Sequence, residues 1–128
     1  MIKNYIKLPK KIKQDWINAL KSGNYIQGSG QLCNFLEGDE LDEIEYCCLG
    51  VLGSLLGCSN ESMRDQELLT DDVCESPLSK SQQYIFSALN DGNTYHHPEQ
   101  KSIFINEEKC IYSFSEIADF IEENVEEC

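Results

Sequence analysis

The apolar residues of this chain fall into four helical stretches, and the one at residues 46–57 is apolar on nearly every face. A helix at the surface shows an apolar stripe, whereas a helix that is apolar all round is normally buried. Gly57 supplies a stop after the last turn. The pattern therefore predicts a central buried helix over residues 47–56. Its apolar positions at helical spacing are Cys48, Leu49, Leu52, Leu55 and Leu56.

Two glycines inside this stretch, Gly50 and Gly53, each weaken a helix by about 1 kcal/mol relative to Ala. A glycine is useful where another backbone comes close, because it has no side chain to keep that backbone away. We therefore expect a close backbone approach to this helix. The stretch is too short to span a bilayer, which needs about twenty residues.

Three further stretches carry apolar residues on one face only. The first follows Pro9, which suits the first helical turn because it has no amide hydrogen to leave unpaired. In this helix Trp16 is the main residue expected to pack in the core, and Gly23 ends the helix. The second follows Ser79 and runs to about Leu89. The faces that define these two helices are Ile12, Trp16, Ala19 and Leu20 (apolar) with Lys10, Lys11, Lys13, Asp15 and Lys21 (polar), and then Ile85, Ala88 and Leu89 (apolar).

The last helix follows Ser113. Both Ser79 and Ser113 are followed three residues later by Gln or Glu, which is the sequence of a capping box. Acidic residues cover the polar face of this last helix. Its apolar face consists of Ile117, Phe120, Ile121 and Val125.

Two pairs of short apolar segments, each pair separated by turn residues, predict two β-hairpins. Residues 2–8 read as a short strand or an extended arm, and residues 58–76 lack periodicity and are predicted to be irregular. Strands in hairpins, without βαβ crossovers, indicate a small α+β fold of about four helices in one domain over residues 1–128. The hairpins are predicted at 32–37 with 41–46, and at 101–105 with 109–112.

The net charge of −13 is unevenly distributed. Residues 1–30 contain six lysines and one acid, Asp15, whereas the rest contains four basic residues and 22 acids. Arg64 is the only arginine, so we do not expect direct binding of nucleic acid, which favours a broad basic face. The acidity favours solubility and repulsion between copies. It also allows an acidic face that binds a basic partner, as in DNA mimics.

Seven cysteines, an odd number, occur without a signal peptide at the N-terminus, so we expect reduced thiols in a cytoplasm. Cys47 and Cys48 are neighbours on a helix, where side chains point about 100° apart, so they do not chelate a metal easily. Both are expected to pack as small hydrophobes, and we predict neither a metal nor a cofactor. A zinc site remains an open alternative, built from Cys74, His96, His97 or Cys110.

Catalytic residues do not stand out. A thiol hydrolase needs a cysteine held against a histidine, and the histidines, His96 and His97, lie in a polar stretch before Pro98. No pair of acids can be singled out among 23. We predict no catalytic residue, which favours a binding protein and leaves a cysteine-dependent enzyme as an alternative.

The best candidate for a ligand site is the glycine-rich segment at residues 23–32. Glycines permit positive φ and leave backbone amides available to an anion, although the segment matches neither a Walker A motif nor a dinucleotide fingerprint. The structural alternative is that Tyr25 packs in the core and Gln27 braces the backbone. The candidate ligand-binding residues are Trp16, Lys21, Tyr25, Gln27, Gly28, Ser29, Gly30 and Gln31.

Three blocks of the chain together resemble a family of short, mostly uncharacterised proteins encoded by bacteriophages and prophages. The chain departs from that pattern by an insertion at residues 93–112, and by Gly53 where a third cysteine commonly stands. The blocks are Trp16-x2-Ala19-Leu20-x-Ser22-Gly23-x-Tyr25-x-Gln27-Gly28-x-Gly30-x-Leu32, Tyr46-Cys47-Cys48-Leu49-Gly50-Val51-Leu52, and Leu89-Asn90-Asp91 with Ser113-Phe114-x-Glu116-Ile117-Ala118-Asp119-x-Ile121-Glu122.

The resemblance implies a phage accessory protein, a class that often acts on host defence. We therefore expect a non-enzymatic counter-defence protein of the host cytoplasm that sequesters a small anionic, nucleotide-type immune signal. The alternative is an acidic inhibitor of a host defence effector or nuclease, which uses residues 37–45 and the last helix. No membrane partner is expected, and a homodimer is one of the oligomeric states left open.

Overall fold

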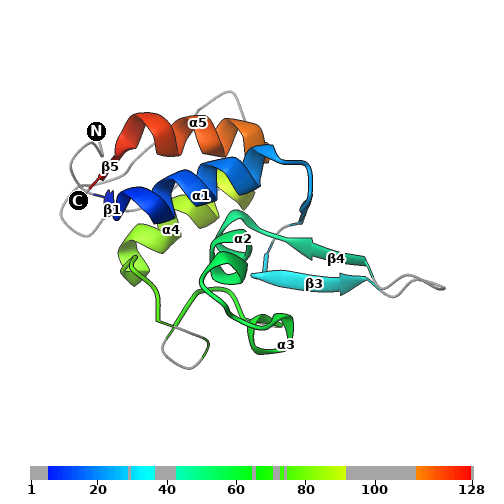
Figure 1. Ribbon diagram of the computed structural model, residues 1–128. Helices are drawn as coiled ribbons and strands as arrows, with labels where there is room; N and C mark the ends of the chain where they lie inside the picture. The colour runs from blue at the N-terminus through cyan, green and yellow to red at the C-terminus, as the bar shows by residue number, and fades with distance from the viewer. Residues whose placement is uncertain are drawn as a thin grey trace.

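The computed structural model describes residues 6–28, 30–36, 43–64, 66–70, 73, 75–91 and 112–127. Over these residues the chain is a small mixed α+β fold, as predicted (Figure 1). Helices α1 (Lys10–Lys21), α4 (Lys80–Asp91) and α5 (Phe114–Asn124) lie together, and α2 (Cys48–Leu55) lies between them and a three-stranded sheet. Among the helices that are described, none combines the length and apolarity needed to cross a membrane.

The three-stranded sheet contains the first predicted hairpin. Strands β3 (Cys33–Leu36) and β4 (Glu43–Tyr46) are antiparallel. On its other side β4 pairs in parallel with β2 (Ile26–Gln27), which gives the order β2-β4-β3. The second predicted hairpin lies outside the described residues, apart from Tyr112.

A second, two-stranded sheet pairs β1 (Ile6–Leu8) in parallel with β5 (Val125–Glu127), so that the two ends of the described chain meet. The expectation that strands occur only as hairpins is therefore wrong for β1, β2 and β5. The short strand predicted within residues 2–8 is present as β1. Strands β2 and β5 are two and three residues long, too short to show the alternation by which a strand is recognised in a sequence.

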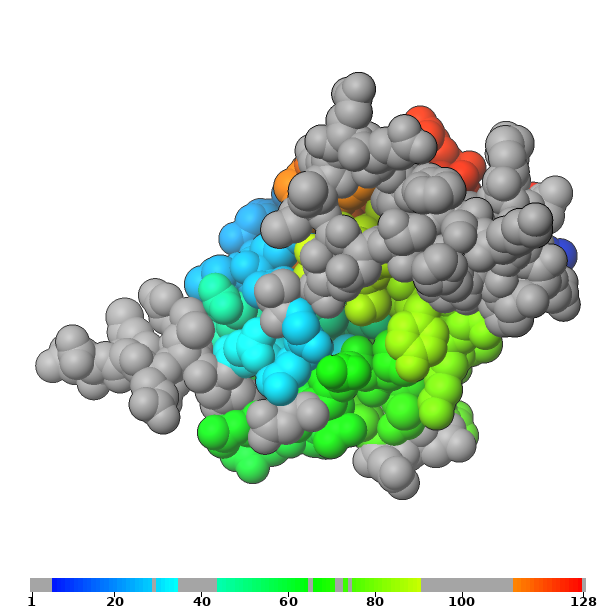
Figure 2. All heavy atoms as spheres, turned by 180° about the vertical axis from the view of Figure 1, so that it is seen from behind, coloured from blue at the N-terminus to red at the C-terminus, as the bar shows by residue number. Residues whose placement is uncertain are grey.

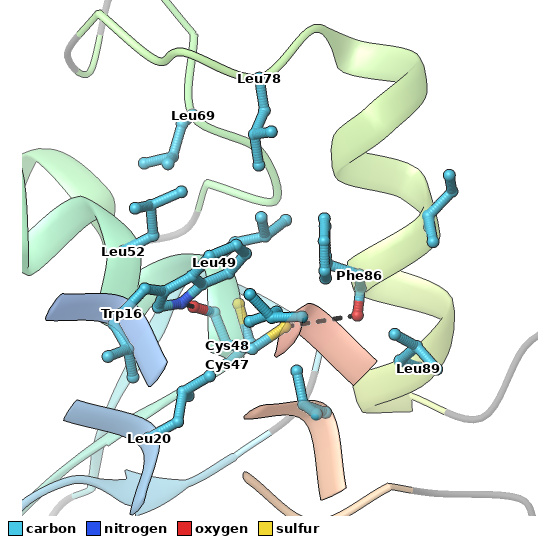
Figure 3. Packing of buried hydrophobic residues seen from close by; sticks show 14 of the residues in the cluster. Trp16, Leu20, Cys47, Cys48, Leu49, Leu52, Leu69, Leu78, Phe86 and Leu89 are labelled. Atoms are coloured by element: carbon cyan, nitrogen blue, oxygen red, sulfur yellow. Dashed lines mark hydrogen bonds between the residues drawn. The ribbon is translucent and has the colours of Figure 1, made fainter. Parts of the chain in front are cut away.

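Helix α2 is the buried centre of the fold, as predicted. Its residues from Cys48 to Gly53 are buried, and the Trp16 indole N–H donates to the Cys48 carbonyl at 3.0 Å. The Trp16 ring also meets the Phe86 ring of α4 edge to face, with centroids 4.8 Å apart (Figure 3). The prediction is wrong for Leu55, which is 41% exposed, because the last turn of α2 extends beyond the core.

Gly50 confirms the predicted close approach of a backbone. A Cβ placed on Gly50 would overlap the carbonyl oxygen of Leu32, the same oxygen that accepts a hydrogen bond from the Cys47 amide at 3.1 Å. Gly53 differs, because its neighbours are the ends of side chains. A Cβ there would lie 2.6 Å from Met63 Sδ and 2.8 Å from Leu69 Cδ2.

Both predicted capping boxes are present. Ser79 N–H donates to Gln82 Oε1 at 2.9 Å, and Gln82 N–H donates to Ser79 Oγ at 3.2 Å. At the start of α5, Ser113 and Glu116 make the same reciprocal pair at 3.0 and 3.2 Å. Gly23 follows α1 with φ of 79°, in the left-handed region that ends many helices.

The described residues of 58–76 are mostly irregular, as predicted. They include a one-turn helix, α3 (Asn60–Met63), whose N-cap Ser59 accepts from the Ser62 amide at 3.1 Å; a single turn is too short to show periodicity. One local prediction is wrong. Lys13, assigned to the polar side of α1, is only 7% exposed. Its Nζ donates to the Glu122 carbonyl at 3.5 Å, because a long methylene stem lets lysine cross an apolar interface to a polar end.

We predict that Gly50→Ala destabilises the protein by about 3 kcal/mol or more, because the added methyl group must displace backbone and not a flexible side chain. Gly53→Ala is the matched control in the same helix, where side chains can move and alanine gains about 1 kcal/mol of helix propensity. Urea unfolding followed by circular dichroism measures both. Equal losses of stability in the two variants would contradict the prediction.

Candidate functional site

Gln27, a predicted ligand residue, is bonded on every side to the protein itself. Its Nε2 donates to Asn90 Oδ1 at 3.1 Å and to the Tyr112 carbonyl at 2.7 Å. Its Oε1 accepts from the Phe114 amide at 3.0 Å. Both amide hydrogens and the carbonyl oxygen make hydrogen bonds within the protein, so the side chain braces the backbone, as in the structural alternative.

Asn90 is the partner that the sequence did not reveal. It is 1% exposed, and its Oδ1 also accepts from the Cys48 amide at 3.2 Å while its Nδ2 donates to the Gly28 carbonyl at 2.7 Å. The amides in the first turn of a helix have no partner within the helix. Asn90 therefore caps α2 from a segment 42 residues away.

A second amide at this end of α2 is also satisfied internally. Cys47 is the N-cap residue, and its Sγ accepts from the Gly50 amide at 3.4 Å. The donors that a helix N-terminus can offer to an anion are engaged at both of these positions. We therefore do not place an anion site at α2.

The hydrogen bonds of Gln27 and Asn90 join four segments of the chain. The Tyr112 amide adds to them by donating to the Leu89 carbonyl at 3.0 Å. Apart from Tyr112, the bonded residues lie in the blocks on which the phage-family resemblance rests, and Asn90 stands in the block Leu89-Asn90-Asp91. Its role as a brace gave no separate signal, because a polar residue is ordinary at the expected end of a helix.

Tyr25 is half-buried, as in the structural alternative. Its ring meets the Tyr46 ring edge to face with centroids 5.2 Å apart, and its hydroxyl lies 3.5 Å from Ser54 Oγ. Burial raises the pKa of the Tyr46 hydroxyl, which donates to Asn60 Oδ1 at 3.0 Å. The pair of tyrosines links the glycine-rich segment to α2 and the sheet.

Trp16 and Lys21, the two candidates on α1, have separate roles. Trp16 is fully buried, and its N–H donates to the Cys48 carbonyl, so its indole is part of the core in this structure. Lys21 Nζ lies 2.9 Å from Asp119 Oδ1 in an exposed ion pair between α1 and α5. The positive charge expected beside the glycine-rich segment is thus offset by α5.

The remaining candidates lie on the glycine-rich segment. Gly28 is required by the sheet, because a Cβ there would lie 2.7 Å from Glu45 Cβ, and its amide donates to the Tyr46 carbonyl at 2.8 Å. Gly30 has φ of +86° and open space around its Cα, and Gln31 is half-buried. Ser29 lies outside the described residues. Figure 2 shows this segment, in light blue to cyan, at the surface.

The described cysteines favour packing over chemistry. Cys33, Cys47 and Cys48 are free and buried, and Cys48 Sγ donates to the Phe86 carbonyl at 3.4 Å (Figure 3). Cys58 is disulfide-bonded, so the expectation of reduced thiols is wrong at this position. Within the described ranges, no group of three metal-ligating side chains comes together; Cys74, His96, His97 and Cys110 lie outside them.

The chain is thus a small α+β protein in which Gln27 and Trp16, two of the predicted ligand residues, form hydrogen bonds within the fold. The chain belongs to a family described as a domain of unknown function, DUF8296, whose profile matches residues 8–82, more than half of its length. The matched region includes the glycine-rich segment and α2 but neither Asn90 nor α5. No curated protein and no solved structure matches the chain.

We predict that Gln27→Glu costs about 2–3 kcal/mol of stability at neutral pH, because an ionised carboxylate would face the oxygens of Asn90 and Tyr112. Those oxygens raise the folded pKa of the new carboxyl above its unfolded value of about 4.3. The stability loss is therefore small below that pH and grows as the pH rises through the folded pKa.

The control for this variant is Gln31→Glu, which makes the same charge change four residues away at a half-buried position. We expect it to change stability by no more than about 0.5 kcal/mol. Chemical unfolding at a series of pH values distinguishes the two. A pH-independent loss in Gln27→Glu would show that the amide donors are not the important feature.

We predict that Cys33, Cys47 and Cys48 react with iodoacetamide slowly in the native protein and rapidly in denaturant, because each is buried. Mass spectrometry of peptides after mild alkylation gives the rate at each thiol. One described thiol that reacts much faster than the other two would instead support the cysteine-dependent enzyme.

Proposed function

We propose that this chain is a non-enzymatic accessory protein that binds a basic protein partner through the acidic face of α5 and β5. The observation that carries the proposal is the composition of residues 112–127, which contain six acids and neither lysine nor arginine. Four of these acids are exposed and two are partly buried. The exposed ones are Asp119, Glu122, Glu123 and Glu127, and the others are Glu116 and Glu126.

Glu116 belongs to the capping box that starts α5, and Asp119 pairs with Lys21, but the packing of α5 comes from its apolar residues. Ile117, Ala118 and Ile121 are buried, and they supply the packing of α5. Acids that lie close together on a helix repel one another and lower its stability. A binding function would explain why they are present. The alternative explanation is a solvated helix face, which the binding experiment below separates from a partner site.

The linear density of charge on α5 supports a DNA-mimic type of surface. From Glu116 to Glu123 the helix rises about 10 Å and carries four acids. The three intervals between these acids average roughly 3.5 Å along the helix axis. One strand of B-DNA carries one charge per about 3.4 Å. A protein groove that binds a phosphate backbone therefore meets a similar density of negative charge here.

The ion pair of Lys21 with Asp119 does not prevent a partner from binding to this surface. Exposed pairs of this kind contribute about 0–1 kcal/mol, so a cation on a partner can replace Lys21 at little cost. A complex formed mainly through exposed charges associates fast and weakens with salt. Such a partner is a basic protein of the host cell.

The phage-family resemblance supports the biological role. We propose counter-defence in the host cytoplasm, with a host defence effector or a nuclease as the basic partner. The resemblance covers both the glycine-rich segment and α5, whereas the DUF8296 match ends before α5.

Sequestration of a nucleotide-type signal is the second candidate function, favoured by one observation. Gly30 combines a positive φ with open space at its Cα, which permits a ligand to approach the backbone. Gln27 and Trp16 no longer take part in this candidate site. The residues left for it are Lys21, Tyr25, Gly30 and Gln31, with Ser29 outside the described part.

We predict that a variant with Asp119→Asn, Glu122→Gln and Glu123→Gln binds an oligolysine peptide about tenfold more weakly at low salt. At roughly 0.5 kcal/mol for each exposed charge, the three changes remove about 1.5 kcal/mol of binding free energy. Fluorescence anisotropy over a range of NaCl concentrations measures the affinity and its salt dependence, which should become shallower in the variant.

The matched control carries Glu61→Gln, Glu67→Gln and Glu75→Gln, three exposed acids on α3 and the following loop. Its net charge is the same as that of the α5 variant, so long-range attraction is reduced equally. We expect nearly unchanged affinity. Equal weakening in both variants would mean that the whole acidic surface, and not α5, attracts the peptide.

For the second candidate, we predict that native mass spectrometry with a panel of cyclic and linear nucleotides shows one bound nucleotide per site, lost in Lys21→Met and retained in Lys11→Met. Lys11 pairs with Asp15 on α1 itself, so it matches the charge change. A protein that binds none of the panel excludes this candidate for these ligands and leaves the acidic-face proposal in place.

A further inference from the structure

We draw no further inference here: the strongest candidate, the exposed apolar side chains of Ile26 on edge strand β2 and Leu55 at the end of α2, which flank the contact between Tyr25 and Ser54, carries nothing because nothing in the structure shows what covers it.

Discussion

The buried side-chain amide of Asn90 is the interaction on which the arrangement of the other elements depends. It bonds to the first amide of α2, to the carbonyl of Gly28 and to Gln27, and so fixes two separate segments, the start of α2 and the glycine-rich segment, against the end of α4. A buried polar group left without a partner costs about 1–3 kcal/mol. Among the described residues no buried side-chain polar atom lacks a hydrogen bond, so this cost is avoided. Gln83 does the same for the loop before α4, since its amide bonds to both backbone groups of Leu69 and to the Leu78 carbonyl.

The elements that the sequence predicts correctly are those with a local signal. Periodicity identifies the four long helices, and the capping residues Ser79 and Ser113 mark two of their starts. The site is different, because Gln27 and Asn90 are 63 residues apart and each looks like an ordinary polar residue of a loop or a helix end. Polar character shows that a side chain needs partners, but not whether those partners are water, a ligand or the chain itself. The same uncertainty explains Lys13, whose carbonyl partner lies 109 residues away.

Whether a polar side chain bonds to the chain itself or faces solvent decides which part of the molecule is available for binding. Gln27 and Trp16 are the candidates with the most recognisable binding chemistry, yet their polar groups are saturated within the fold. Both side chains instead help to build the junction around α2, because Trp16 bonds to Cys48 and Gln27 bonds to Asn90. At the surface, α5 and β5 expose four carboxylates, those of Asp119, Glu122, Glu123 and Glu127. We therefore propose the binding of a basic partner ahead of nucleotide sequestration.

The structure brings the oppositely charged parts of the chain together. The lysine-rich N-terminal part forms α1, and the acid-rich C-terminal part forms α5, which packs against it. Lys13 reaches the last turn of α5 and Lys21 reaches Asp119, so α1 offsets negative charge on the side of α5 that faces it. Glu122 and Glu123 remain exposed, and the short strand β5 extends the acidic surface with Glu127. The acidic surface therefore borders the lysines of α1, because Asp119, which pairs with Lys21, lies three and four residues before Glu122 and Glu123 on the same helix.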